Sequence, residues 1–327
     1  MTAAPNPLLS ICIPTYNRAR FLKQTLDCIV SQQIFIETDL IEVVISNNSS
    51  TDDTESLALD FQKSFPCKIR YVCTQETVHS TVNFANVLLH AQGKLCKLHN
   101  DSISILPGFM EAAISLIQSN FDEKNIIFFL DGNTKCPDAA SLCASMDDFV
   151  SHASFYMTWI GGFSLWKKDI PNYAEYFTKS GHHFAQTEIL LALLAHGRRI
   201  FVYNTKFGEE HPGVTKQVTT KFLEDVYIGE YVPLLKRQVD NGLLDPSVCD
   251  REVTRLIIFY YIRYYYRLQQ KFQLSFVKDF SFLRKYVQAY KYYIILCLYP
   301  LYFCMNTYIG SAKLRMPVSL LRKILHG

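Results

Sequence analysis

The chain has 327 residues, which is enough for one large or two ordinary domains with a sizeable core. Its 49% hydrophobic and 19% charged residues exclude a disordered chain, and a formal net charge of +3 gives no general attraction to nucleic acid. The ten cysteines include no C-x-x-C pair, which argues against a structural zinc site or a disulfide framework and favours a reducing cytosol. The first residues show no basic stretch followed by an apolar core, so we expect no export.

The first part of the chain alternates between short apolar runs and amphipathic segments. Apolar runs that end in polar loops predict buried strands, and segments with apolar residues on one face predict helices. In chain order the predicted elements are strand 8–13, helix 19–31, strand 41–45, a helix ending near 65, strand 69–73, helix 80–91, strand 94–98, helix 109–117 and strand 125–130. This alternation predicts an α/β fold with a mostly parallel sheet and helices on both faces.

Polar and aromatic side chains follow three of these predicted strands. The three loops contain Pro14-Thr15-Tyr16-Asn17, Asn47-Asn48 and Asn100-Asp101-Ser102. Ligands of open parallel sheets bind beyond the carboxyl ends of strands, where such loops converge. An aromatic ring can stack on a base, amides can bond to its edge, and a carboxylate can take a ribose hydroxyl or a metal-bound diphosphate. Each loop alone is explained better by packing or turn formation, but together they indicate a nucleotide site.

The usual phosphate-binding motifs are missing from these turns. Neither G-x-G-x-x-G nor G-x-x-x-x-G-K-[ST] occurs in them, so the sequence supports neither that dinucleotide fingerprint nor a P-loop. A nucleotidylyltransferase would need a Gly-rich, basic first loop to hold a triphosphate, and residues 14–17 are neither Gly-rich nor basic.

Three strings together carry a resemblance to a known family. They are S-I-C-I-P-T-Y-N-R at 10–18, V-V-I-S-N-N-S-S-T-D-D-T at 43–54 and N-D-S at 100–102. Their order and spacing resemble the nucleotide-sugar half of the inverting family 2 glycosyltransferases of GT-A fold, over roughly the first 120 residues. The resemblance implies that Thr15 and Tyr16 receive the base and that the Asn47-Asn48 loop flanks it. It also implies that residues 100–102 bind ribose and a divalent metal, Mg²⁺ or Mn²⁺.

The chain departs from the pattern of that family at two of these loops. The family usually has an Asp in the second loop, where this chain has Asn47 and Asn48, and an amide prefers a different base edge. In the metal motif only Asp101 is acidic, because Ser102 stands where the family usually has its last acid. A single carboxylate can still hold Mg²⁺ or Mn²⁺ together with waters and substrate phosphates. The resemblance adds His211, in an H-P-G loop, as a ligand of metal or phosphate.

Further along the chain, the resemblance points to an acceptor side. Gly161-Gly162 stands between large aromatics, and the family has such a pair near the sugar and acceptor, although a tight bend in a buried strand explains it nearly as well. The family's catalytic acid falls on Gln186, which cannot accept a proton, so we predict Glu188 as the general base. His182 and His183 are the reserve, and a place in the first helical turn is the alternative for Glu188.

Helical patterning dominates after about residue 220. We therefore predict a GT-A domain at 1–218, with a donor half to about 120 and an acceptor half at 121–218, followed by a helical C-terminal region at 219–327. Segment 286–310 is mostly uncharged, rich in Tyr and flanked by Lys and Arg, which predicts a membrane-interface segment. A buried pair of C-terminal helices fits that segment equally well.

These features predict an inverting glycosyltransferase that transfers a sugar from a nucleotide-sugar donor to a glycan or lipid-linked glycan acceptor. The expected setting is cell-surface polysaccharide synthesis, such as lipopolysaccharide or capsule, on the cytoplasmic side of a membrane and without nucleic acid. Glu188 would deprotonate the acceptor, and Asp101 with a metal would stabilise the departing diphosphate. The alternative is a non-catalytic nucleotide-sugar-binding or scaffold protein of GT-A fold, which would lack acids as this chain does at Asn47, Ser102 and Gln186.

Overall fold

The protein is described by a computed structural model that covers residues 6–119, 125–132, 139–214, 222–257 and 281–286. The chain divides into two compact units, Met1–Lys216 and Gln217–Gly327, called here the N-terminal and C-terminal units.

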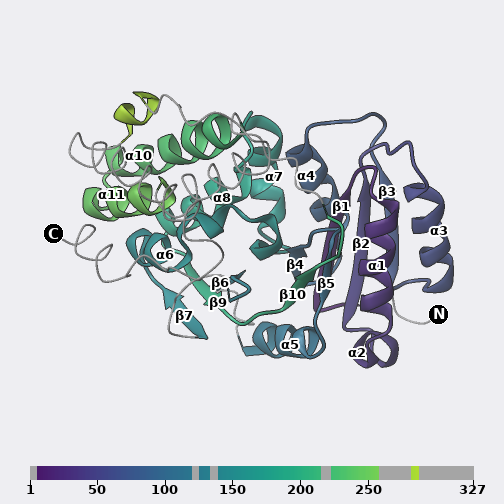
Figure 1. Cartoon of the computed structure of the whole chain (residues 1–327). Coiled ribbons are helices and arrows are strands. Elements are labelled where there is room, and N and C mark those ends of the chain that lie inside the picture. Colours follow the sequence, from purple (N-terminus) through teal and green to yellow (C-terminus); the bar gives the residue numbers. More distant parts are fainter. Residues whose placement is uncertain (1–5, 120–124, 133–138, 215–221, 258–280, 287–327) are drawn as a thin grey trace, which may run out of the picture. The chain divides into compact units, whose positions relative to one another are not determined.

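The main sheet of the N-terminal unit has five strands among the described residues (Figure 1). In the order in which they pair, these are β3 (Ile69–Cys73), β2 (Ile41–Asn47), β1 (Leu9–Thr15), β4 (Leu95–Leu98) and β8 (Ser164–Trp166). β1 to β4 are parallel, and β8 is antiparallel to β4. Every residue of β1, β2 and β4 is buried, as expected for strands covered on both faces.

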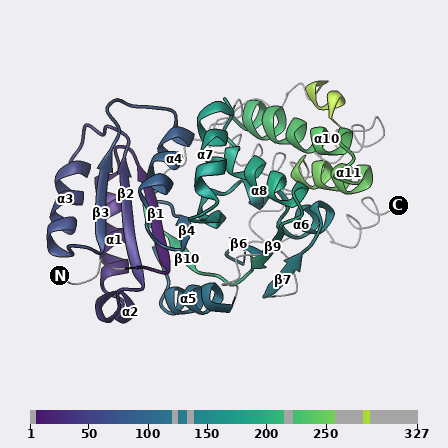
Figure 2. The same cartoon turned by 180° about the vertical axis from the view of Figure 1, so that it is seen from behind.

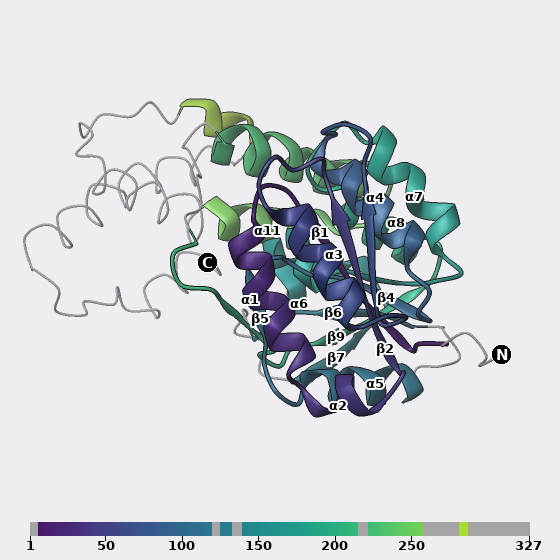
Figure 3. The same cartoon turned by 90° about the vertical axis from the view of Figure 1, so that its right-hand side faces the viewer.

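Helices connect the parallel strands and cover the sheet. They are α1 (Ala19–Val30), α2 (Gln33–Glu37), α3 (Thr54–Ser64), α4 (Ser80–His90) and α5 (Phe109–Ser119). Right-handed crossovers from β1 to β2 and from β2 to β3 put α1 and α3 on one face, and the return from β3 to β4 puts α4 on the other. The contacts agree, because α1 packs against α3 whereas α4 packs against α7 (Ile170–Lys179) (Figure 3).

The described part of this unit also contains two smaller sheets (Figure 2). One pairs β5 (Ile103–Ile105) with β10 (Gly208–Glu210), and the other has the order β6 (Asn125–Phe129), β9 (Arg199–Tyr203), β7 (Ala140–Cys143). The remaining helical segments are α6 (Met146–Ala153), α8 (Ala185–Ala195) and 3-10 turns at Ser154–Thr158 and Ile160–Gly162.

Two details differ from the sequence prediction. The first strand was expected to stop before Pro14 but runs to Thr15, because beyond Cys12 it pairs with β2 alone and needs no Pro14 N–H toward β4. Gly161-Gly162 lies in a 3-10 turn before β8, so the alternative of a bend inside a buried strand is wrong.

The C-terminal unit is helical where it is described. It contains a π-helical segment Leu223–Tyr231, α10 (Val232–Asp240), α11 (Pro246–Arg255) and a 3-10 turn Ser281–Lys285. The buried hydroxyl of Tyr231 donates to Oε1 of Glu252 at 3.2 Å and so joins the first segment to α11. The predicted interface segment 286–310 lies outside the described residues after Tyr286.

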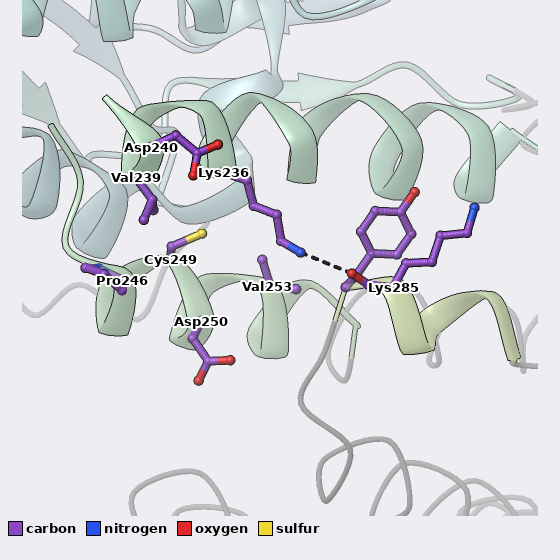
Figure 4. A pocket seen from close by; sticks show the side chains of 9 residues that line it. Lys236, Val239, Asp240, Pro246, Cys249, Asp250, Val253 and Lys285 are labelled. Atoms are coloured by element: carbon purple, nitrogen blue, oxygen red, sulfur yellow. Dashed lines mark hydrogen bonds between the residues drawn. The ribbon is translucent and has the colours of Figure 1, made fainter. Parts of the chain in front are cut away.

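A hollow of about 460 Å³ lies beside α10 and α11 (Figure 4). It is lined by both charged and apolar side chains, and Nζ of Lys236 donates to the carbonyl of Lys285 at 3.2 Å on its wall. None of the helices in the described part of the chain combines the length and apolar character needed to cross a membrane.

Candidate functional site

The carboxyl ends of β1 and β4 place two of the predicted side chains in direct contact. Cys12 of β1 pairs with Leu98 of β4 in a parallel register. Thr15 and Asp101 each follow that pair by three residues, and the Thr15 hydroxyl donates a 2.9 Å hydrogen bond to Oδ2 of Asp101. Asn47 lies at the same edge, because it pairs with Thr15 across β1 and β2. The sheet therefore brings together residues from all three predicted loops.

Asp101 is held beside a cation. It is only 6% exposed, and burial of a carboxylate is costly unless a partner compensates it. Nη1 of Arg18 lies 3.4 Å from Oδ1 of Asp101 and 3.5 Å from Oγ of Ser102. Burial raises the pKa of Asp101, while the charge of Arg18 and the hydroxyl of Thr15 oppose that rise. The sequence prediction missed Arg18, although it ends the 10–18 string that carried the family resemblance.

His211 is fastened by hydroxyl groups. Its backbone N–H donates to the carbonyl of Ser102 at 3.0 Å. In the ring, Nε2 lies 2.8 Å from Oγ1 of Thr25, and Nδ1 lies 3.2 Å from Oγ of Ser104. The Thr25 hydroxyl uses its one proton to donate to the carbonyl of Asp101, so it must accept a hydrogen bond from Nε2–H of His211. Because a neutral imidazole carries only one proton, Nδ1 is unprotonated and accepts from the hydroxyl of Ser104. Burial lowers the pKa of His211, which favours this neutral ring. The ring nitrogens thus hold the H-P-G loop to α1 and β5, and the backbone N–H of His211 holds it to the Asp101 loop.

These residues do not fit a resident divalent ion. Mg²⁺ needs six oxygen ligands in near-octahedral geometry, and most such sites use one or two carboxylates that are open to the ion. Asp101 supplies one carboxylate whose two oxygens face Thr15 and Arg18, and His211 has both nitrogens engaged. Within the described ranges, no group of three His, Cys, Asp or Glu residues lies close enough together to hold a metal. The atoms available as metal ligands therefore give no support to the prediction of Mg²⁺ or Mn²⁺ at Asp101 and His211.

The two amides of the second loop form bonds within the protein. Asn48 donates to the carbonyl of Val78 and accepts from its N–H, both at 2.9 Å. Asn47 donates to the Tyr71 hydroxyl and accepts from the N–H of Ser50, both at 3.0 Å. Both amides are buried, so they shape the rim of the site. That they also contact a base stays a prediction.

Tyr16 and Asn17 form the outer part of the first loop, beyond the buried Pro14. Tyr16 is 44% exposed, which makes it one of the exposed large hydrophobic residues. Asn17 adopts a φ of 51°, in the left-handed region that Asn tolerates better than most residues, and its Oδ1 accepts from the N–H of Thr51 at 2.7 Å. Asn17 thus ties the first loop to the second.

Gly161 packs directly against Asn100 of the Asp101 loop, and Gly162 packs against β6. A Cβ at Gly161 would collide with the Trp159 ring and stand 2.7 Å from Oδ1 of Asn100, and one at Gly162 would stand 2.6 Å from the carbonyl of Phe129. That oxygen of Asn100 is buried and has no hydrogen-bond partner among the described residues. The glycines are therefore required by packing, and Gly161 brings the acceptor half of the unit to the residue next to Asp101.

Lys97 is a second residue that the sequence prediction missed. It is fully buried in β4, and its Nζ donates to the carbonyl of Gly161 at 2.6 Å and to that of Leu98 at 3.1 Å. The rings of Phe109, Phe129 and Phe207 surround the ammonium, with the nearest centroid 4.5 Å away. Burial lowers its pKa to about 7. The available signal was a single charge inside the apolar run 95–98.

Glu188, the predicted base, lies at the start of α8 and is paired with a histidine. Its Oε2 is 3.0 Å from Nε2 of His182, and each side chain is 19% exposed. Gln186 points elsewhere, because it is buried and its amide donates to the carbonyl of Thr158 at 2.6 Å. That bond attaches the start of α8 to the segment that ends in the Gly161 turn.

His183, the other reserve base, reaches toward the donor half of the site. Its ring packs edge-on against that of His79, with 5.3 Å between the centroids. His79 precedes α4 and follows Val78, which the Asn48 amide holds. Through these contacts the 182–188 segment and the Asn48 loop border the same region.

Comparison with known proteins agrees with this arrangement. Residues 10–134 match the model of the glycosyl transferase family 2. The abequosyltransferase RfbV of Salmonella typhimurium is 33% identical over 112 residues, which cover 32% of this chain and 33% of that protein. The GalNAc(5)-diNAcBac-PP-undecaprenol beta-1,3-glucosyltransferase of Campylobacter jejuni is 26% identical over 169 residues, 50% of this chain and 53% of that one. The chain thus spans from a third to about half of the length of these two relatives.

Solved structures show the same fold. TarS of S. aureus, residues 1–349 in complex with UDP, superposes with a TM-score of 0.54 at 13% identity and covers 80% of this chain and 76% of that chain. The mannosyltransferase PcManGT of Pyrobaculum calidifontis, in complex with GDP-Man and Mn²⁺, gives a TM-score of 0.51 at 16% identity, with coverage of 91% and 84%. The predicted GT-A fold with added C-terminal helices is confirmed.

Proposed function

We propose that the chain transfers a sugar from a nucleotide-sugar donor to an acceptor hydroxyl, because residues 10–134 match the model of glycosyl transferase family 2 and the fold is that of GT-A enzymes. The observation that carries the proposal is the contact of Thr15 and Arg18 with Asp101 and Ser102 at the carboxyl edge of β1 and β4. This edge is where open α/β sheets bind nucleotides.

The donor would lie across this edge. The exposed Tyr16 ring offers a stacking face for the base, and the Asn47-Asn48 loop borders it. Asp101, with its Thr15 bond, would accept a ribose hydroxyl at the floor of the site. Asn100 and the Gly161 turn would lie toward the sugar, since the unpaired oxygen of Asn100 faces that turn. Support for this placement comes from the shared edge, and support for a nucleotide-sugar donor comes from the UDP and GDP-Man bound by the two solved neighbours.

Transfer would proceed with inversion by direct displacement. The acceptor oxygen forms a bond to the anomeric carbon while the bond from that carbon to the diphosphate breaks. Glu188 would take the acceptor's proton, and the hydrogen bond to His182 fixes the direction of the carboxylate. The electron pair leaves with the diphosphate, whose charge needs a positive group at the donor edge. The attachment of α8 to the Gly161 turn, through Gln186 and Thr158, supports a base on the acceptor side.

The acceptor proposed is a glycan or lipid-linked glycan in cell-surface polysaccharide synthesis. Support comes from the relatives, which include a glucosyltransferase named for an undecaprenol-linked acceptor and a minor teichoic acid biosynthesis protein. A lipid-linked acceptor would place the protein peripherally at the inner face of the cytoplasmic membrane. Residues 1–218 would form the catalytic domain, and the division of the chain after Lys216 supports that boundary.

A divalent metal has support from one neighbour, which was solved with Mn²⁺. In this chain Asp101 is the residue that would contact such an ion. Because the possible ligand atoms around Asp101 do not fit a divalent ion, no step of the proposed reaction depends on a metal.

A panel of UDP-, GDP-, dTDP- and CDP-sugars tests the proposal by thermal shift and by release of nucleoside diphosphate. We expect one nucleotide class to raise the melting temperature of the full chain, because a ligand bound only to the native state stabilises it. Turnover should follow when an acceptor glycan is added. No stabilisation by any donor would refute the proposal.

The same panel distinguishes the second candidate, a non-catalytic binding or scaffold protein. The observation that favours it is Gln186, an amide at the position where the family resemblance implies an acid, with its nitrogen committed to Thr158. Donor binding with no release of nucleoside diphosphate under any acceptor would support that candidate.

A further inference from the structure

Arg18 is the solvent-exposed partner of the buried carboxylate of the site. The Asp101 side chain is 8% exposed, whereas that of Arg18 is 42% exposed. The guanidinium is therefore the more accessible member of this pair for an anion at the carboxyl edge of β1 and β4. Arg18 follows the first loop directly and precedes α1, so its backbone is fixed by a buried strand on one side and a helix on the other.

The guanidinium holds the place that a metal would need. Its Nη1 lies within 3.5 Å of both Oδ1 of Asp101 and Oγ of Ser102, the acid and the hydroxyl that end the Asn100-Asp101-Ser102 loop. A divalent ion bound to Oδ1 of Asp101 would have to displace the guanidinium of Arg18. The ion would then have only one carboxylate as a ligand. Ser102, where the resemblance implies a second acid, adds no negative charge to favour that exchange.

The start of α1 does not supply the positive charge instead. Its first N–H, that of Ala19, already donates to Oδ2 of Asp52 at 3.0 Å. The helix terminus is thus occupied by a carboxylate of the protein, and Arg18 is left as the cationic group beside Asp101.

We propose that Arg18 supplies the charge that holds the donor's diphosphate, so that the chain binds nucleoside diphosphates without a divalent ion. A guanidinium presents several N–H donors in a fixed plane, which suits two oxygens of a diphosphate, and it keeps its charge at any working pH. On binding, the side chain turns from Asp101 and Ser102 toward the phosphates, and Asp101 becomes available to a ribose hydroxyl. This inference rests on the proposed function, because it assigns the cation of that donor site.

Binding of UDP and GDP to the full chain, measured by calorimetry in EDTA and again in Mn²⁺ or Mg²⁺, tests the assignment. The variants are Arg18→Ala, Arg18→Lys and the control Arg20→Ala, which removes an exposed charge two residues away, over the Phe21 ring. We expect the wild type to bind one of the two nucleotides equally well in EDTA and in metal. Arg18→Ala should weaken that binding by about tenfold to a hundredfold, as expected for hydrogen bonds to a charged group. Arg18→Lys should recover part of the loss, and Arg20→Ala should change it by less than about twofold.

Three outcomes would overturn the assignment. Wild-type binding that requires Mn²⁺ or Mg²⁺ overturns it whatever the variants do. Binding in EDTA that Arg18→Ala leaves intact overturns it as well, since another group then holds the phosphates. Both of these leave the proposed function standing, because the wild type still binds a nucleoside diphosphate. Absence of binding to UDP, GDP, CDP, dTDP and their sugars, with and without metal, overturns the proposed function together with the assignment.

Discussion

Replacement of Lys97 by Met should make the stability of the N-terminal unit less dependent on pH. The pKa of Lys97 lies at about 7 in the folded protein, because burial disfavours the ammonium, against 10.5 for the free side chain. Asp131 and Cys12 act on it in the opposite direction, and its charge in turn helps to lower the pKa of His99 to about 3. Between pH 7 and pH 10.5 the unfolded chain therefore binds a proton at this position that the folded chain does not bind.

The sign and size of the effect follow from that difference. Stability rises with pH wherever the unfolded state binds more protons, by up to about 1.4 kcal/mol per pH unit for one group. The depressed pKa thus makes the wild type gain stability as pH rises through the window, and it loses that gain as pH falls back to about 7. Relative to Lys97→Met, which cannot titrate, the wild type should gain about 2 kcal/mol between pH 7 and pH 9.

Urea unfolding at several pH values, followed by tryptophan fluorescence, measures this difference. The chain has two tryptophans, Trp159 and Trp166, and both lie in the N-terminal unit, so the signal reports on that unit. His99 stays neutral in both proteins across this pH range and does not disturb the comparison. A wild-type minus variant difference that is flat from pH 7 to pH 9 would show that Lys97 keeps an ordinary pKa in the fold, and the reasoning would be refuted.

Three further predictions concern the site. Glu188→Gln should lower kcat by about a hundredfold or more with unchanged donor binding, whereas Glu175→Gln, on an exposed helical pair, should leave both unchanged; equal effects of the two would contradict the role of Glu188 as base. Gly161→Ala should destabilise the N-terminal unit by about 1–3 kcal/mol, because the added methyl meets Trp159 and Asn100, and a melting temperature like that of the wild type would count against this packing. Thr25→Val should cost about 1–3 kcal/mol in urea unfolding, since the carbonyl of Asp101 and the ring of His211 lose their shared hydroxyl, and an unchanged midpoint would show that this hydroxyl holds nothing.

The strands and helices of the donor half could be predicted from the sequence because their signals are local. Continuous apolar runs such as 41–45 and one-sided apolar helices such as α1 depend on neighbours a few residues away. The short strands β5 and β10 were missed because neither has a pattern of its own; three residues each, they are strands only by pairing Ile105 with Gly208 across the chain.

In the candidate site, too, some features could be predicted from the sequence and others could not. Asp101 and Thr15 could be placed at one edge from strand order alone, and the structure joins them by a hydrogen bond. What Arg18 and Lys97 do could not be predicted, because a charge in a loop and a charge in a strand acquire their roles only from distant partners such as the Gly161 carbonyl. The hydrogen bonds of the Asn47 and Asn48 amides within the protein could not be predicted for the same reason, since their partners lie far along the chain.

In the proposed function, the nucleoside diphosphate binds at a single site at the carboxyl edge of β1, β2 and β4. Hydrogen exchange of the full chain with and without the nucleotide that stabilises it measures where the ligand lies. The account predicts slower exchange in peptides that contain residues 15–18, 47–50 and 99–103, together and in proportion to occupancy. Protection confined to other parts of the chain, with these three loops unchanged, would contradict it.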